Sequence, residues 1–246
     1  MAALLELAHL SKRFGGVVVA DDLSLSVDAG AAVGLVGPNG AGKTSLFSMI
    51  SGDLRPDRGT VRFDGTTLNR LGVAARCRLG VARTFQVPRP FEQMTVFENV
   101  LVAAQQGARA RGAASHRAAL ASLERCGLAP LANRRAGSLG LLDRKRLELA
   151  RALASGPRLL LLDEVAGGLT EPEVQVLVGV VASIQAEGTA VVWIEHVVRA
   201  LVGAVERLLC LAGGAFIADG QPEAVLADPV VREVYLGSEL AIEGAR

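Results

Sequence analysis

The segment Gly37–Thr44 reads Gly-Pro-Asn-Gly-Ala-Gly-Lys-Thr and limits the folds open to this chain more than any other feature. Its pattern, Gly-x-x-x-x-Gly-Lys-Ser/Thr, holds an anion where it follows a strand and opens a helix. A β-like run at Ala32–Val36 precedes it, and a helix-like run at Lys43–Ile50 follows it and ends at Gly52. With 28 glycines but three lysines in 246 residues, an accidental match has odds on the order of a few in a thousand. We therefore predict a phosphate-binding loop.

The chemistry of this loop predicts that its ligand is a nucleoside triphosphate with its metal ion. Glycines let backbone N–H groups turn inward around phosphates, and the start of a helix adds partial positive charge. Lys43 would reach the outer phosphates, while the Thr44 hydroxyl would hold Mg²⁺. We predict binding of ATP and Mg²⁺. The predicted nucleotide-binding residues are Phe14, Gly37, Pro38, Asn39, Gly40, Ala41, Gly42, Lys43, Thr44 and Ser45.

A second motif is an apolar run, Leu159–Leu162, that ends abruptly in the acids Asp163 and Glu164. Acids at the carboxyl end of a buried parallel strand face the crevice where α/β sheets bind ligands. We predict that Asp163 holds Mg²⁺, directly or through water. Glu164 would polarise the attacking water as a general base. The alternative is a strand end capped by solvated acids.

Three single residues join this prediction, each with a structural alternative. His196 follows a strand and would contact the γ-phosphate, although a lone histidine is often structural. Gln86 lies where an amide could reach both Mg²⁺ and water, but its residue type alone indicates a surface glutamine, and its role comes from the family resemblance given below. Phe14 would stack on adenine, a contact worth about 1–3 kcal/mol per base in nucleic-acid complexes, or would pack in the core. The predicted catalytic residues are Glu164, His196 and Lys43, and the predicted metal ligands are Thr44, Gln86 and Asp163.

The hydrophobic pattern predicts an α/β fold with a helical middle third. Short strands separated by turns are expected at 4–10, 23–27, 32–36 and 60–63. Alanine- and leucine-rich helices are expected at 95–106, 115–127 and 141–155. Strands at 159–162, 189–194 and 208–211 then alternate with helices at 171–187 and 197–205, which favours a parallel sheet, and 215–218 completes a hairpin. We predict one domain over 1–246, with an α/β core and β lobe at 1–93 and 156–246 and a helical subdomain at 94–155.

Composition excludes several classes of protein. A net charge of +1 provides no excess positive potential for sequence-independent binding to nucleic acid. Three cysteines far apart in sequence form no even disulfide set and suit a reducing compartment. The N-terminus lacks the positive cluster of a secretion signal, and the 13-residue run Val174–Ala186 is too short to cross a bilayer. We therefore expect a cytoplasmic protein that meets membranes only through partners.

The order of these features along nearly the whole chain resembles the ATP-binding cassette (ABC) family. The resemblance implies a RecA-like α/β core with an antiparallel β lobe and an inserted helical subdomain. It also implies ATP hydrolysis coupled to transmembrane transport. The implied roles are adenine stacking for Phe14, phosphate binding for Gly37–Ser45, coupling for Gln86, metal and catalytic acids for Asp163 and Glu164, and a switch histidine for His196.

Finer features are similar to the ATPase subunits of bacterial importers for branched-chain amino acids and related amides. These features are Val81–Gln86, Met94–Val100, Ile194–His196, Gly220–Val225, Asp228–Val230 and Tyr235–Gly237. The implied partners are a second ABC ATPase subunit, transmembrane permease subunits and, indirectly, an external solute-binding protein. The subunit would lie on the inner face of the cell membrane and contact the permease near Gln86–Phe91.

Two segments depart from the family pattern. Leu139-Gly-Leu-Leu-Asp143 stands where the family usually has Leu-Ser-Gly-Gly-Gln, the signature that caps ATP on the partner's phosphate loop. Leucine side chains replace glycines there, and the serine hydroxyl is missing at Gly140. We predict that this chain activates its partner's site less than the partner activates the site here. The loop Val165–Thr170 also lacks the usual proline and acid.

Two other functions remain as alternatives. A soluble ABC protein of repair or translation would usually carry two cassettes or long inserted arms, which this chain lacks. An ATP-binding regulatory subunit with negligible turnover is compatible with the altered signature. A small P-loop kinase is disfavoured by the 120 positions between Lys43 and Asp163 and by the absence of an obvious second-substrate pocket.

Overall fold

The structure, a computed structural model that describes residues 3–234, is built around a six-stranded sheet in the order β10-β9-β3-β8-β7-β6. Five of these strands run parallel, and β10 pairs antiparallel with β9. The predicted parallel sheet is therefore confirmed. The strands are β3 (Ala32–Val36), β6 (Val81–Arg83), β7 (Leu159–Asp163), β8 (Ala190–Ile194), β9 (Arg207–Ala212) and β10 (Ala215–Gly220).

The run of leucines in β7 is explained by burial on both faces of this sheet. Leu159 and Leu161 pack into the hydrophobic cluster that includes Phe47 of helix α1, whereas Leu160 and Leu162 pack into the cluster on the opposite face. Successive side chains of a strand point to opposite faces, so a strand covered on both sides reads as a continuous apolar run. The two clusters sandwich the sheet and leave its carboxyl edge for polar side chains.

A second, antiparallel sheet in the order β2-β1-β4-β5 forms the predicted β lobe. It packs against α1 (Lys43–Ser51) on one side of the central sheet, within the same hydrophobic cluster. Its strands are β1 (Leu5–Phe14), β2 (Val17–Val27), β4 (Arg58–Phe63) and β5 (Thr66–Thr67). β1 and β2 extend beyond the predicted limits into segments where burial does not alternate and the pairing of the two strands shifts register.

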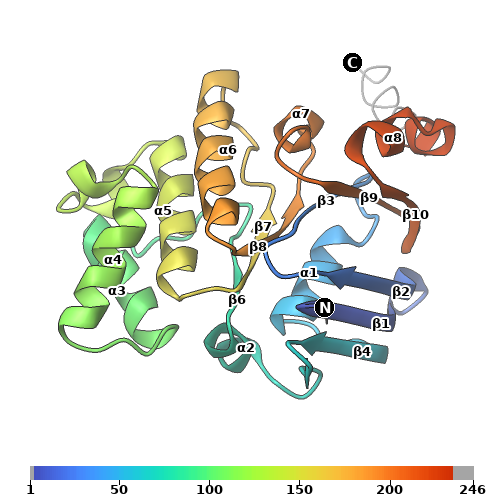
Figure 1. Cartoon of the computed structure of the whole chain (residues 1–246), viewed down its shortest axis with the longest axis horizontal. Coiled ribbons are helices and arrows are strands. Elements are labelled where there is room, and N and C mark those ends of the chain that lie inside the picture. Colours follow the sequence, from blue (N-terminus) through green and yellow to red (C-terminus); the bar gives the residue numbers. More distant parts are fainter. Residues whose placement is uncertain (1–2, 235–246) are drawn as a thin grey trace.

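Figure 1 shows the helices of the middle third gathered at the end of the molecule opposite the β lobe. They are α3 (Val96–Gln106), α4 (Ala113–Arg125) and α5 (Leu141–Ala154), which pack on one another, with short 3-10 turns at Ala129–Leu131 and Ala136–Ser138. α3 begins with a capping box, in which the Thr95 hydroxyl accepts from Glu98 N while the Glu98 carboxylate accepts from Thr95 N.

The remaining helices are short except for α6 (Glu171–Ala186), which starts at a second capping box formed by Thr170 and Glu173. α7 (Val198–Leu201) is shorter than predicted because the chain turns at Gly203, which has φ +82°. α2 (Val73–Leu79) and α8 (Pro222–Ala227) were not predicted. No helix of the described part of the chain is long and apolar enough to span a membrane. Tyr235–Gly237 lies outside the described residues.

Candidate active site

Apart from Phe14, the predicted site residues lie at or after the carboxyl ends of four parallel strands. The phosphate loop follows β3, Gln86 follows β6, Asp163 ends β7 and His196 follows β8. Because these four strands are neighbours in the order β3-β8-β7-β6, their carboxyl ends meet at one edge of the sheet. Ligands of open α/β sheets bind at this edge. Segments up to about 160 positions apart in sequence are thus brought to one place by topology alone.

Two glycines of the loop are required by close backbone contacts. Gly37 has φ +149°, and a Cβ there would lie 2.0 Å from Leu211 O. Gly42 has φ +107°, and a Cβ there would lie 2.0 Å from Val19 O of the β lobe. Any larger residue would push the loop away from β9 or β2. These glycines therefore set the loop against both sheets and hold it above the N-terminus of α1.

The Lys43 ammonium folds back into this loop. Its Nζ donates to Gly37 O at 2.6 Å and to Pro38 O at 3.0 Å, and the side chain is buried. Burial lowers the pKa of Lys43, and the nearby carboxylates of Glu164 and Asp163 act in the opposite direction. A buried cation beside two carboxylates can bind a polyanion and its metal ion together.

The rest of the loop is arranged to expose backbone donors. Asn39, Gly40 and Thr44 are exposed, whereas Ala41 is buried against the β lobe. α1 has no acidic residue in its first turn and no side chain that caps its N-terminal N–H groups. The partial positive charge of the helix start is therefore directed at the solvent-facing side of the loop, where a phosphate would lie.

Asp163 forms a buried ion pair with Arg83, a residue that was not singled out from the sequence. Arg83 Nη2 lies 2.7 Å from Asp163 Oδ2, and both side chains are almost fully buried. The same guanidinium donates to Ser48 Oγ at 3.0 Å and lies 5.4 Å from the ring centroid of Phe85. Arg83 therefore connects the end of β6 to α1 and β7 and holds one oxygen of Asp163.

Glu164 is brought into contact with both Gln86 and His196. Its Oε1 lies 2.8 Å from His196 Nε2, and its Oε2 accepts a hydrogen bond from Gln86 Nε2. The Gln86 amide oxygen stays available, because only its nitrogen is used by Glu164. Glu164 itself has φ +48°, a left-handed conformation that is rare outside glycine. The structure thus joins three of the predicted residues in one cluster.

Phe14 lies at the end of β1 and is 50% exposed, which excludes the alternative of core packing. The β1–β2 hairpin that carries it also contributes Val19, whose carbonyl touches the phosphate loop. The Lys12 ammonium lies 5.4 Å from the Phe14 ring centroid. An exposed aromatic face beside the loop is suited to stacking on a nucleotide base.

The N-terminus of a second helix, α5, matters to function because it carries the altered signature. α5 begins at Leu141 after Gly140, and Leu141 is 45% exposed. Its side chain approaches Gly168, where a Cβ would lie 3.3 Å from Leu141 Cδ2. Asp143 stands in the first turn and pairs with Arg146 at 3.4 Å. An apolar side chain and a carboxylate thus occupy a helix start that the family resemblance assigns to a phosphate.

Two side chains near this edge of the sheet could not be predicted from the sequence. Lys145 of α5 and Glu195, between β8 and His196, are both buried. Neither belongs to a recognised spacing, and the only available indication was that Glu195 precedes the predicted histidine.

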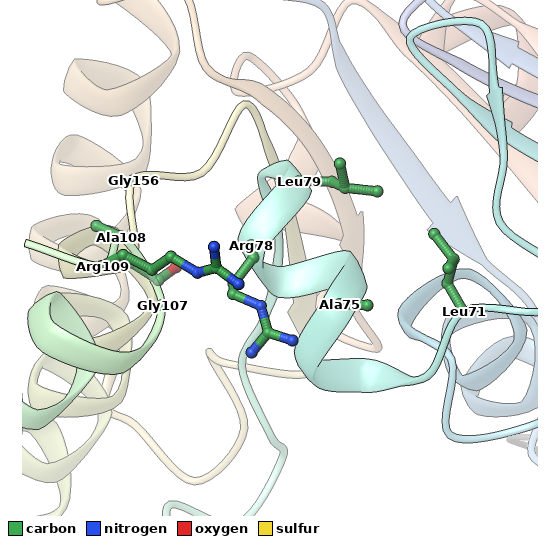
Figure 2. A pocket seen from close by; sticks show the side chains of 9 residues that line it. Leu71, Ala75, Arg78, Leu79, Gly107, Ala108, Arg109 and Gly156 are labelled. Atoms are coloured by element: carbon green, nitrogen blue, oxygen red, sulfur yellow. The ribbon is translucent and has the colours of Figure 1, made fainter.

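A hollow of about 600 Å³ lies elsewhere, between α2 and the end of α3 (Figure 2). Arg78 of α2 and Arg109, in the segment that follows α3, extend into it. None of the predicted site residues lines it, so the hollow is separate from the edge where the predicted chemistry gathers.

The fold and the edge define the class of protein: an ATPase with a phosphate loop on a RecA-like core, an antiparallel β lobe and a helical subdomain. The family model described as "ABC transporter" matches residues 20–167, and the chain belongs to this family. A further model, described as "Branched-chain amino acid ATP-binding cassette transporter", matches residues 217–241.

Relatives support the same assignment over nearly the whole chain. The high-affinity branched-chain amino acid transport ATP-binding protein BraF of Pseudomonas aeruginosa is 36% identical over 95% of this chain and 98% of its own. LivG of Escherichia coli, described in the same words, is 37% identical with the same coverage. The lipopolysaccharide export system ATP-binding protein LptB of Acidithiobacillus ferridurans is 36% identical over 98% of this chain and 100% of its own.

A solved structure confirms the fold class. An ATP-binding cassette of an ABC transporter in its ADP conformation superposes with a TM-score of 0.88 at 29% identity, covering 96% of this chain and 100% of that one.

Proposed function

We propose that this chain is the ATP-hydrolysing subunit of an importer for branched-chain amino acids and drives transport through separate membrane subunits. The observation that carries the proposal is the cluster of Glu164 with Gln86 and His196, beside the Lys43 loop, at one edge of the sheet. An ATPase needs a phosphate cradle, a metal-binding acid and a base for water within reach of one another. The edge supplies all three.

The nucleotide would lie along the phosphate loop, with its adenine on Phe14 and its phosphates over the N–H groups from Asn39 to Ser45. The Lys43 ammonium would exchange its carbonyl acceptors for β- and γ-phosphate oxygens. The oxygen donors of Thr44, Gln86 and Asp163 suit Mg²⁺, which prefers oxygen ligands and keeps several waters. The bound ion would neutralise charge between the β- and γ-phosphates.

Glu164 would take the proton from the attacking water. Both of its oxygens are already engaged, yet each carboxylate oxygen has a second lone pair for a water proton. Gln86 and His196 would hold the carboxylate on either side, so that its direction is set before water arrives. Positioning and electrostatics of this kind account for most of the catalysis of phosphoryl transfer.

The transported solute is inferred from the relatives and from the model that matches residues 217–241, which name branched-chain amino acids. LptB is as similar as BraF, so the ATPase site by itself does not identify the solute. Uptake has to be measured. The chain, purified with its membrane subunits and reconstituted with the solute-binding protein, should import leucine, isoleucine or valine in an ATP-dependent manner. A Glu164→Gln complex that transported as fast as the parent would contradict the proposal.

The permease would dock in a groove of about 540 Å³ between α2, the segment after β6 and α3. Phe85 and Phe91 are both exposed and line this same groove, and apolar side chains that gather on one part of the surface mark interaction sites. The groove adjoins Gln86, so a docked helix would lie close to Glu164 through one side chain. The proposed groove lies beside Gln86–Phe91, the segment for which the permease contact was predicted.

Cys77 provides a test of this docking site because it lines the groove and is half-buried. Burial raises the pKa of Cys126 to about 12 and also raises that of Cys210, so both thiols should stay unreactive. Alkylation of the native chain should therefore label Cys77, and assembly with the permease should protect it. Equal labelling of Cys77 with and without the permease would reject the groove as the docking site.

Two copies of the chain, or the chain and a sister subunit, would pair so that each signature helix faces the other's phosphate loop. The assembled pair would lie on the inner face of the membrane. The helical subdomain is proposed to span 94–155, with 1–93 and 156–246 forming the core and β lobe. A regulatory role with little turnover is the second candidate, favoured by Leu141 and Asp143 at the start of α5. Turnover by the assembled complex, measured beside ATP affinity, decides between the two.

A further inference from the structure

The backbone of Glu164 is held in a strained conformation by contacts on both sides. Its φ of +48° lies in the left-handed region, where a long side chain is disfavoured and the surrounding structure must impose the geometry. Its own N–H donates to Ile194 O at 2.9 Å, continuing the ladder of β7 and β8. Val165 follows, where the family resemblance implies proline, so no ring restricts Glu164 from that side.

Two buried charged side chains contact the backbone around this strained residue. Lys145 Nζ donates to Glu164 O at 3.3 Å. Glu195 Oε1 accepts from Ala166 N at 2.7 Å and from Trp193 Nε1 at 3.0 Å. The ammonium therefore holds the carbonyl of Glu164, and the carboxylate holds the N–H two residues later. The peptide segment between them cannot rotate without breaking one of these contacts.

The two side chains also attract each other. Glu195 is 1% exposed, its Oε2 has no hydrogen-bond partner among residues 3–234, and Lys145 is also buried. Burial raises the pKa of Glu195 and lowers that of Lys145, and the charge of each partner opposes the shift of the other. Removing Lys145 would leave the carboxylate of Glu195 buried without a compensating cation, which is costly, whereas Lys145 is also attracted by Glu164. Lys145 lies on α5, whereas Glu195 follows a central strand, so the attraction links two parts of the fold.

We propose that Lys145 and Glu195 act as a buried pair of positioning residues that fixes Glu164 in the conformation from which its carboxylate reaches Gln86 and His196. The pair also ties the helix that carries the signature to the loop after the catalytic acid. The inference rests on the proposed role of Glu164 as the base.

Substitutions at the two positions test the pair in the assembled complex. Lys145→Met removes the ammonium, and Glu195→Gln removes the charge while its amide oxygen can still accept from Ala166 N and Trp193 Nε1. Each should lower kcat by about 10- to 100-fold, the effect expected when a catalytic group is misplaced. The KM for ATP should change less than about twofold, because the phosphate loop is untouched. Lys145→Arg, which keeps the charge, should retain most of the rate.

The double variant Lys145→Met with Glu195→Gln separates positioning from general stability. If the residues act as a pair, the double variant should lose no more kcat than either single variant. It should also melt at a higher temperature than Lys145→Met alone, since no buried charge is left unpaired. Additive losses in kcat would contradict the pair, as would a folded Lys145→Met variant with the parent's kcat.

Glu187→Gln is the matched control. It breaks an ion pair of 2.8 Å with Arg125 at the end of α6 remote from Glu164, and kcat should stay unchanged. Glu164→Gln shows which idea has failed. If that variant keeps the parent's turnover, the proposed function is wrong; if it abolishes turnover while Lys145→Met does not, only the positioning role is wrong.

Discussion

Two helix N-termini of this chain are assigned to phosphate by the same physics but differ in the residues around them. α1 follows Gly42, has Lys43 as its first residue and carries no acid in its first turn. α5 follows Gly140, begins with Leu141 and has Asp143 in its first turn. Both starts carry unpaired N–H groups and partial positive charge. Only the first has the open backbone and the cation that a phosphate needs.

The difference shows that a chain can keep the catalytic residues of its own ATP site while altering the signature helix that it would contribute to its partner's ATP site. Glu164, Gln86 and His196 are all in contact at its own edge. The side chain of Leu141 instead lies near Gly168, in the loop that follows Glu164. We infer that, if this chain pairs with a sister subunit whose signature is intact, the complex has one strongly activated site, on this chain, and one weakly activated site, on its partner.

Lys43→Ala should have the largest effect, because it removes the cation from the α1 terminus. Loss of charge-assisted contacts of about 1.5–3 kcal/mol each should weaken ATP binding by roughly 100-fold or more. Nucleotide titration of the purified chain measures this, with circular dichroism to confirm folding. A folded variant that bound ATP as tightly as the parent would refute the assigned role of the phosphate loop.

Glu→Gln substitution of the catalytic acid in each subunit tests the asymmetry directly. In a complex with a sister subunit whose signature is intact, Glu164→Gln here should remove most of the ATPase activity, because this site would receive that signature. The same change in a sister subunit should remove much less. ATP binding should persist in both, since the carboxylate does not hold the phosphates. Equal losses of ATPase rate would show that the two sites are equivalent.

Restoring the signature should have an intermediate effect. The triple change Gly140→Ser, Leu141→Gly and Leu142→Gly opens the backbone at the start of α5 and should raise the partner site's turnover by roughly 3- to 10-fold, about 1 kcal/mol in the barrier. Each new glycine also lowers helix stability by about 1 kcal/mol.

Leu120→Gly is the control for that helix penalty, because Leu120 is exposed on α4 to a similar extent, 44% against 45% for Leu141. It should lower the melting temperature without changing the rate. A triple variant with the parent's turnover would mean that α5 does not face a nucleotide.

Asp143→Asn should produce the smallest change. Removing this charge should raise turnover at the partner's site by about twofold, because a carboxylate in the first turn repels phosphate. Loss of the favourable interaction with the helix dipole should lower the free energy of unfolding by about 0.3–1 kcal/mol. Glu171→Gln at the start of α6 removes a similar charge and should lower stability alone. A rate increase in both variants would point to an effect of net charge.

The features that could be predicted are those marked by a pattern within a short stretch of sequence. The phosphate loop, the acids after β7 and the helices of the middle third each have a signal within about 15 residues, from glycine spacing, from an abrupt polarity change or from helical periodicity. α2 has only seven residues between two glycines, and β6 has only three, so neither has enough periodicity to be recognised.

The residues that were missed depend on contacts between distant segments. Arg83 meets Asp163 from 80 positions away, and Lys145 meets the backbone of Glu164 from another element of the fold. No spacing rule predicts such pairs, because sheet order brings them together. Phe14 is an intermediate case: its residue type indicated either stacking on a base or packing in the core, and only its exposure in the folded hairpin excluded core packing.

The hydrogen bonds of Lys43 to Gly37 O and Pro38 O have a consequence for selectivity among anions. An anion that binds Lys43 must replace two hydrogen-bond acceptors that the protein already supplies. The net binding free energy gained by an anion with a single charge is therefore small. A monovalent ion such as chloride should displace these acceptors poorly, whereas the clustered charge of a triphosphate more than replaces both. The loop should therefore bind the multiply charged nucleotide in preference to the monovalent anions that are abundant in the cell.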